Sequence, residues 1–302
     1  GDGLRIITER DVNFAGTTTW TNAASGNQGH IYTGSGATLS NSGNFLDQTS
    51  ADAVVTNAYG GAESSFINTG TYTKSGASTT DISIGFNNTG TLNVNAGVLN
   101  LGGGGVSSGG IFDVASGATL NFSGGTHTLE NTTSGAGTGR MLVSGGQVDS
   151  NGTLTFAGSI GTTGGTFNTN GVVSAGGLVM TGGTLSGSQA VTISGASTWD
   201  AGFMTGTGST TFNGALALGG DSYRAITERS VNFAGTTTWT NAAVGNQGFF
   251  YTGSGATLTN SGVFQDQTVA DTSINNGLGG ADSVFINTGT YTKSGASTNN
   301  IS

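Results

Sequence analysis

The sequence predicts an all-β protein of the parallel β-helix (β-solenoid) class. Three observations lead to this prediction: the composition, a short repeat of about 20 residues, and a long repeat in which residues 1–83 return as residues 220–302. The chain has 302 residues, including 58 glycines, and it lacks proline and cysteine. No window shows the i, i+3, i+4, i+7 spacing of a helix, whereas alternating segments such as LNV and LNF are typical of strands.

The composition indicates a folded chain of low charge. Only 8% of the residues are charged, against about 25% in ordinary domains. Disordered chains are usually rich in charge and proline, and this chain lacks both. The net charge of −9, with seven scattered basic residues, argues against phosphate binding, which needs clustered Lys and Arg. No apolar run approaches the ~18–20 residues that span a bilayer. We therefore predict no nucleic-acid partner and no membrane insertion.

The short repeat justifies the individual strands. The segment FINTGTY (residues 66–72) returns as FNNTGTL (residues 86–92). Apolar positions in between recur about every six or seven residues, which predicts three short strands per coil of ~20 residues. This spacing aligns two columns of inward side chains: Phe66 with Phe86 and Val106, and Tyr72 with Leu92 and Phe112.

The corners between these strands are rich in glycine and asparagine. Both residues tolerate the positive φ of tight turns, and stacked asparagines such as Asn68 and Asn88 are predicted to form an amide ladder. Parallel crossovers are overwhelmingly right-handed, so we expect a right-handed coil. The competing fold is a β-sandwich, whose strands should alternate over about 5–8 residues with turns every 8–12. Here apolar positions occur more singly and glycine more often.

The long repeat defines the domain organisation. Residues 1–83 and 220–302 are identical at 62 of 83 positions. We interpret residues 1–219 as one full solenoid module and residues 220–302 as the start of a second copy, within a longer array. An open solenoid end exposes unpaired backbone and apolar core. The next module, or another chain stacked end to end into a filament, is expected to cover it.

Two segments resemble a known group of proteins. FNNTGTLNVNAGVLNLGGGG (residues 86–105) and FDVASGATLNFSGGTHTL (residues 112–129) resemble the repeats of filamentous-haemagglutinin-like and autotransporter-type giant bacterial surface adhesins. The resemblance extends over essentially the whole chain, although its motif is loose. It implies a right-handed parallel β-helix and an extracellular, cell-surface location. It contributes no catalytic residue.

A search for chemical motifs yields little. The sequence contains no GxxxxGK[ST] phosphate loop and no HExxH zinc motif. His30 is replaced by Phe249 in the second copy, which indicates a packing or surface position, and His127 is interpreted as a strand residue. We predict no catalytic, cofactor-binding or metal-binding residues, and therefore no cofactor.

The acidic residues are candidates for catalysis, because many β-helices cleave polysaccharides with clustered carboxylates. Asp47 and Asp52 recur as Asp266 and Asp271, and we interpret them as loop or turn residues, with a weak calcium site as the open alternative. Asp11, which is grouped with Glu9 two residues earlier, becomes Ser230 in the second copy. The acids that occur once are far apart in the sequence: Asp113, Glu130, Asp149 and Asp200.

The recurring motif ITER and the aromatic residues leave alternatives open. Arg5, Glu9 and Arg10 indicate either a module junction or a surface ion pair. Several aromatic side chains could form a sugar-stacking surface, although a core position is the default: Trp20, Tyr32, Tyr59, Tyr72 and Trp199.

Taken together, these features favour a structural role without catalysis. We expect a stiff, repetitive segment of an extracellular or cell-surface fibre or giant adhesin, whose main partner is itself, through end-to-end continuation and lateral packing into filaments. The alternative is a polysaccharide-binding or carbohydrate-active β-helix module, with cell-surface polysaccharide as the partner.

Overall fold

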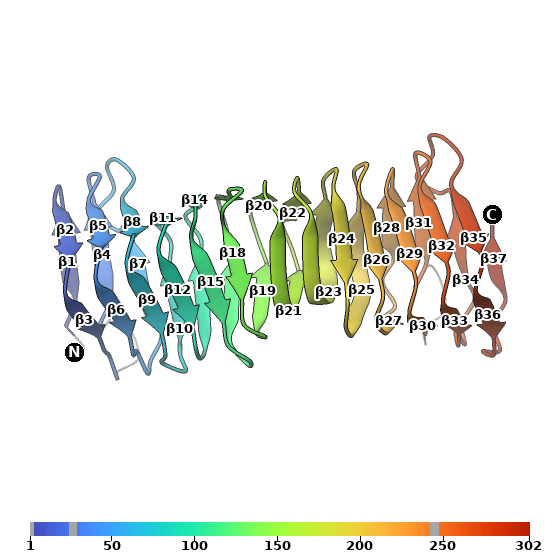
Figure 1. The fold of residues 1–302 in the computed structure, drawn as a ribbon, viewed down its shortest axis with the longest axis horizontal. Coiled ribbons are helices and arrows are strands. Elements are labelled where there is room, and N and C mark those ends of the chain that lie inside the picture. Colours follow the sequence, from blue (N-terminus) through green and yellow to red (C-terminus); the bar gives the residue numbers. More distant parts are fainter. Residues whose placement is uncertain (1–2, 24–28, 242–247) are drawn as a thin grey trace. The chain divides into compact units, whose positions relative to one another are not determined.

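The computed structural model describes residues 3–23, 29–241 and 248–302. The described residues form strands, turns and bends but no helix, and neighbouring strands run parallel to one another. The chain divides into two compact units, residues 1–158 and residues 159–302. Within each unit, successive coils of short strands stack on one another, as Figure 1 shows. The all-β parallel solenoid expected from the sequence is therefore confirmed.

The first unit is built from three ladders of parallel strands. The first ladder contains β1 (Arg5–Thr8), β4 (Ile31–Gly34), β7 (Ala53–Thr56), β10 (Thr79–Ile82), β13 (Val98–Leu101), β16 (Thr119–Phe122) and β19 (Arg140–Val143). The second contains β2 (Asp11–Phe14), β5 (Thr38–Asn41), β8 (Ser65–Asn68), β11 (Gly85–Asn88), β14 (Gly105–Ser107), β17 (Thr126–Leu129) and β20 (Gln147–Ser150). The third contains β3 (Thr17–Trp20), β6 (Asn44–Asp47), β9 (Thr71–Lys74), β12 (Thr91–Val94), β15 (Ile111–Val114) and β18 (Ser134–Ala136).

The second unit repeats this three-sided arrangement. Strand β21 (Leu154–Thr162) contains the division between the units. It is followed by β22 (Thr166–Thr169), β23 (Val173–Ser186), β24 (Ala190–Ile193), β25 (Ser197–Met204), β26 (Ser209–Phe212) and β27 (Leu216–Leu218). The second copy of the module then forms β28 (Arg224–Thr227), β29 (Ser230–Phe233), β30 (Thr236–Trp239), β31 (Phe250–Gly253), β32 (Thr257–Asn260), β33 (Val263–Asp266), β34 (Thr272–Asn275), β35 (Val284–Asn287), β36 (Thr290–Lys293) and β37 (Asn299–Ile301).

The coil length varies more than the sequence predicts. The coil from Phe66 to Phe86, which lie side by side, keeps the predicted repeat. The coil before it is longer, because Phe66 lies beside Leu39. The additional residues lie in corner segments such as residues 57–64, between β7 and β8.

The two predicted columns of inward side chains have different outcomes. The alignment of Phe86 with Val106 is wrong: Asn88 pairs with Ser107, so Gly105 lies opposite Phe86 and the Val106 side chain is 48% exposed. The column of Tyr72, Leu92 and Phe112 is confirmed.

The core is a thin column of inward side chains. On most strands, buried and partly exposed residues alternate, as a half-buried pleated strand requires. Phe45 stacks on Tyr72 with ring centroids 5.2 Å apart, and Phe66 stacks on Phe86 at 5.4 Å. These four side chains are at most 1% exposed. The interpretation of Phe66, Tyr72 and Phe112 as core residues is therefore confirmed.

One column of glycines is explained by close backbone approach. A Cβ atom at Gly70 would lie 2.2 Å from the carbonyl oxygen of Gly43, and one at Gly90 would lie 2.1 Å from that of Gly70. Gly235, Gly262 and Gly289 form an equivalent column in the second unit. Only glycine fits where one coil passes this close to the next.

Candidate functional site

The described residues contain no group of three or more His, Asp or Glu side chains that could hold a metal ion. In this same part of the chain, no helix is long and apolar enough to cross a membrane. The most developed polar features are instead three kinds of buried network: an asparagine ladder, a carboxylate–lysine network present in both copies, and two buried arginines.

The asparagine ladder lies at the corner that follows the second ladder of strands. The Asn41 side-chain amide donates to the Asn68 oxygen at 2.7 Å, and the Asn68 amide donates to the Asn88 oxygen at 2.8 Å. Asn41 and Asn68 also donate to the main-chain carbonyls of Thr71 and Thr91. The predicted ladder is confirmed, and the second unit has an equivalent bond from the Asn260 amide to the Asn287 oxygen.

The carboxylate of Asp47 is the centre of the second network. Asp47 ends β6 and is fully buried. Its Oδ1 accepts hydrogen bonds from the main-chain N–H and hydroxyl of Thr49, at 3.1 and 2.8 Å. Its Oδ2 accepts from the hydroxyls of Tyr72 at 3.0 Å and Thr80 at 2.7 Å. The interpretation of Asp47 as a loop residue is wrong, because the coil turns this side chain inward.

Lys74 is the counter-charge of this carboxylate. It lies directly beside Asp47 in the strand register, is fully buried, and places its Nζ 4.0 Å from Asp47 Oδ1. Nζ also donates to the carbonyl oxygen of Gly76 at 2.5 Å. Burial lowers the pKa of Lys74, an effect that the Asp47 charge opposes. Burial together with the Asp47 carboxylate raises the pKa of Tyr72 well above its ordinary value.

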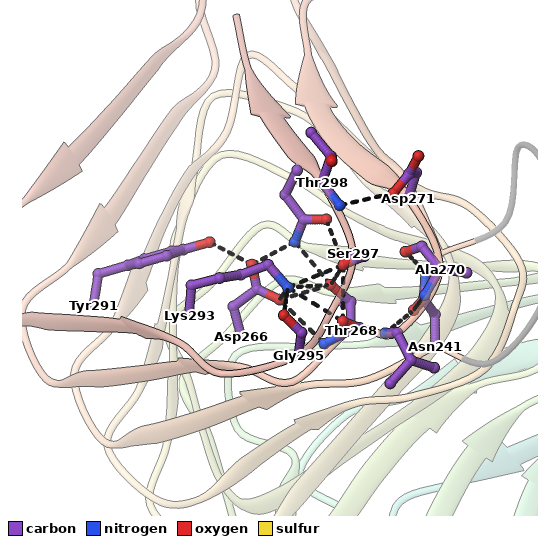
Figure 2. Close-up of polar contacts among 12 residues, drawn as sticks. Asn241, Asp266, Thr268, Ala270, Asp271, Tyr291, Lys293, Gly295, Ser297 and Thr298 are labelled. Carbon is purple, nitrogen blue, oxygen red and sulfur yellow. Dashed lines mark hydrogen bonds and ion pairs between the residues drawn. The ribbon is translucent and has the colours of Figure 1, made fainter.

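The second copy repeats this network, as Figure 2 shows. Asp266 accepts from the Tyr291 hydroxyl at 2.8 Å and from the Thr268 hydroxyl at 2.7 Å. Lys293 Nζ lies 3.5 Å from Asp266 Oδ1. Asn299 stands where the first copy has Thr80 and also donates to Asp266 Oδ2. The exposure differs: the Lys293 side chain is 28% exposed, whereas that of Lys74 is fully buried.

Asp52 and Asp271 have a separate role at the surface. Both are exposed, and each accepts a main-chain N–H from the next coil, from Thr79 at 2.9 Å and from Thr298 at 2.7 Å. Their interpretation as turn residues is confirmed. The structure thus separates Asp47 from Asp52, since one is in the core and the other at a surface corner.

This arrangement is suited to anchoring a coil rather than to acid–base chemistry. A carboxylate offers about four lone-pair sites, and those of Asp47 accept four hydrogen bonds from the protein. The group is also fully buried. It therefore has no free, accessible position for a substrate proton, and its energetic role is to keep Lys74 paired within the core.

The third feature is a pair of buried arginines at the start of the second copy. Arg224 and Arg229 are both fully buried. Burial lowers the pKa of each to about 10, and for Arg224 the nearby Asp200 opposes this effect. The equivalent residues of the first copy differ, because Arg10 is exposed and Arg5 is half-buried. Of the two interpretations of the ITER motif, the structure thus favours the module junction.

The remaining candidates lie as follows. His127 is buried in β17 and its Nε2 lies 3.2 Å from the carbonyl oxygen of Leu101, while His30 accepts the N–H of Val54. Both are packing residues. Trp20, Tyr72 and Trp199 are buried, whereas Tyr59 is 52% exposed. The acids considered for catalysis in the first coil, Glu9 and Asp11, are exposed: their side chains lie at the surface.

Sequence reasoning missed the roles of Lys74 and Lys293, although a signal was present. Six of the seven basic residues form three pairs at equivalent positions of the two copies: Arg5 with Arg224, Arg10 with Arg229, and Lys74 with Lys293. In a chain so poor in charge, this retention of every duplicated cation indicates a structural requirement.

Comparison with known proteins gives no relative: no family model, no curated protein and no solved structure matches the chain.

Proposed function

We propose that this chain is a segment of an extracellular or cell-surface fibre of the giant-adhesin type, without catalytic activity. In this proposal, modules equivalent to residues 1–219 continue one another as stacked coils. Paired backbone ladders and a thin apolar core give the fibre its length and stiffness.

The observation that carries the proposal is the way the second copy begins. Strands β28, β29 and β30 pair in parallel register with β25, β26 and β27, which end the first module. The glycine column also continues here, since a Cβ at Gly235 would lie 2.2 Å from the carbonyl oxygen of Gly214. One module therefore follows another as the next coil of the same stack.

The low charge of the exterior suits this role. Most outward positions of the strands carry Thr, Ser or Asn, as in β3, β9 and β36. Such a surface attracts unrelated macromolecules only weakly by electrostatics, and its low charge also allows fibres to pack side by side.

Cryo-electron microscopy of native material from the source cells tests the proposal. We expect long unbranched filaments with a layer spacing of about 4.8 Å along the axis. The density should repeat with a period that corresponds to one module, residues 1–219. Short, separate particles that are capped at both ends would overturn the proposal.

A second candidate, polysaccharide binding, is supported by one exposed aromatic cluster. Phe203 and Tyr223 are 37% and 46% exposed, and Tyr223 lies 6.0 Å from Phe203 and 5.6 Å from Tyr251 between ring centroids. Exposed aromatic rings can bind the apolar faces of sugars. Binding to a panel of bacterial polysaccharides that is lost in Tyr223→Ala would support this candidate, and an absence of binding across the panel would remove it.

A further inference from the structure

The two buried arginines of the second copy reach into the coil that ends the first module. Arg229 lies between β28 and β29, directly after Glu228, whose φ is 64°. Its Nε donates to the Thr210 hydroxyl at 2.8 Å. Its Nη1 donates to the carbonyl oxygens of Thr205 and Gly187 at 2.9 and 3.3 Å, and its Nη2 to that of Ser209 at 3.1 Å.

Arg224 makes a second connection of the same kind. Its Nε donates to the carbonyl oxygen of Trp199 at 2.6 Å, and its Nη2 donates to that of Gly219. Its Nη1 donates to the carbonyl oxygen of Gly248 at 3.2 Å, and the guanidinium carbon lies 5.4 Å from the centre of the Phe250 ring. Arg224 therefore joins the end of one module to the first coils of the next.

The acceptors of Arg229 belong to one short stretch, residues 187–210, and all but one of them are main-chain carbonyls. A planar guanidinium presents five N–H groups on three nitrogens in a fixed fork, whereas a lysine has three N–H groups on one nitrogen. The combination of Thr210 with these corner carbonyls forms a socket that is specific in shape for an arginine.

The first copy carries the same arginines without this socket. Arg10 is exposed, although its ITER motif and the positive φ of Glu9, 56°, match the second copy. Arg5 keeps the bond to Gly29, which is the equivalent of the bond from Arg224 to Gly248. Beside them, Phe14 is half-buried, whereas its equivalent Phe233 is fully buried. Arg5, Phe14 and their neighbours line a cavity of about 120 Å³ under the first coil.

We propose that the face of the first coil (β1, β2 and β3) turned away from β4, β5 and β6 is a docking surface for a coil with the sequence of residues 187–219 from a preceding copy of the module. Arg10 inserts into the socket of that coil as Arg229 does, and Arg5 completes the bonds that Arg224 makes. The two arginines fix the register between modules. This inference rests on the modular array of the proposed function and adds the identity of the docking partner and the residues that recognise it.

The test compares matched substitutions in the chain of residues 1–302 and in an extended chain, in which residues 84–219 precede residue 1. Methionine keeps the length of the arginine stem and removes the donors. Hydrogen exchange of β26 and β29 should accelerate about tenfold or more in Arg229→Met, whereas Arg10→Met in the unextended chain should leave exchange in β2 within about twofold. In the extended chain, Arg10→Met should accelerate exchange as strongly as Arg229→Met.

An extended chain in which Arg10→Met leaves exchange unchanged would overturn the inference, as would an Arg229→Met chain with unaltered exchange. If Arg229→Met does not fold, Arg229→Lys provides the second variant. We expect hydrogen exchange in Arg229→Lys to accelerate by an intermediate factor, and exchange that does not accelerate would contradict the inference. These rates depend only on the junction. The absence of filaments from native material would overturn the proposed function, whereas the exchange rates test the arginine docking by itself.

Discussion

The two copies of the module have nearly the same sequence, but equivalent residues differ in burial. Tyr72 and Phe66 are fully buried, whereas the equivalent Tyr291 and Phe285 are partly exposed. The opposite holds at the start of the copies, where Arg229 is buried and Arg10 is exposed. The difference shows that the burial of a side chain depends on the adjacent coil as well as on the sequence of its own coil.

The cavities show the same dependence on neighbours. Val284, Phe285 and Ile301 line a cavity of about 110 Å³ beside the coil of β35 and β37. In the first copy the equivalent strands β8 and β10 are covered by β11 and β13. The strand face that is covered in the first copy is thus uncovered at the equivalent strands of the second copy.

The largest effect is expected at the buried ion pair. Asp47→Ala would remove the counter-charge of the fully buried Lys74, and we expect a loss of about 3–5 kcal/mol in local stability. The matched change Asp266→Ala should cost about 1–2 kcal/mol, because the Lys293 side chain is partly exposed and water can solvate its charge. Native-state hydrogen exchange of β9 and β36 measures both values. Equal losses would contradict the comparison.

A smaller effect is expected in the asparagine ladder. Asn68→Ala removes an acceptor for Asn41 and the donors to Asn88 and Thr91, which should cost about 1–3 kcal/mol. Asn287→Ala removes only the acceptor for Asn260, and a loss of at most about 1 kcal/mol is expected. Exchange rates in β8 and β35 provide the measurement. A loss at Asn287 that matches the loss at Asn68 would count against the account.

An alkaline titration sharpens the comparison through the two tyrosines. The pKa values of Tyr72 and Tyr291 are both raised by burial and by the neighbouring aspartate. Above pH 10 the unfolded chain loses these protons while the folded chain retains them, so stability falls as the pH rises above 10. Tyr72→Phe should remove part of this fall in the first unit. Tyrosine absorbance in the folded state should show these two side chains ionising last, and ionisation of Tyr72 near its ordinary pKa would contradict the burial argument.

The smallest effect is expected at His127. Burial lowers its pKa below 6.5, although its bond to Leu101 opposes the shift. The unfolded chain then binds the proton first as the pH falls, so the stability of the first unit should decrease below pH 6.5. His127→Gln should flatten this decrease. A denaturation midpoint with the same acid dependence in both proteins would show that other groups control it.

The sequence alone predicted the coil architecture, the Tyr72 column and the Asn68–Asn88 ladder, because these depend on the short repeat and its local pattern. It did not predict the Asp47–Lys74 pair. That pair forms because a coil longer than the predicted repeat brings Lys74 beside Asp47. The length of this coil depends on its corner segments, which the short repeat does not describe. The alignment of Val106 failed for a related reason: one residue fewer in a glycine-rich corner, near Gly105 with its φ of 140°, shifts the strand by one position.

The site was only partly accessible to sequence reasoning. From the sequence, the ITER arginines could belong to a module junction or to a surface ion pair. These two possibilities can be distinguished only when the residues of the adjacent coil are known. Asp52 and Asp271 were recognisable as turn residues because an exposed corner aspartate needs only a nearby main-chain N–H. The buried carboxylate of Asp47 accepts four hydrogen bonds from three residues in different segments, and no local sequence pattern contains all three.

The central claim is that a neighbouring coil converts exposed end residues into core. The most direct measurement is hydrogen exchange on a chain in which residues 84–219 follow Ser302. In the unextended chain, amides of β35 and β36 should exchange faster than those of β8 and β9. In the extended chain the account predicts that the two sets become equally slow. Amides of β35 and β36 that stay fast in the extended chain would contradict it.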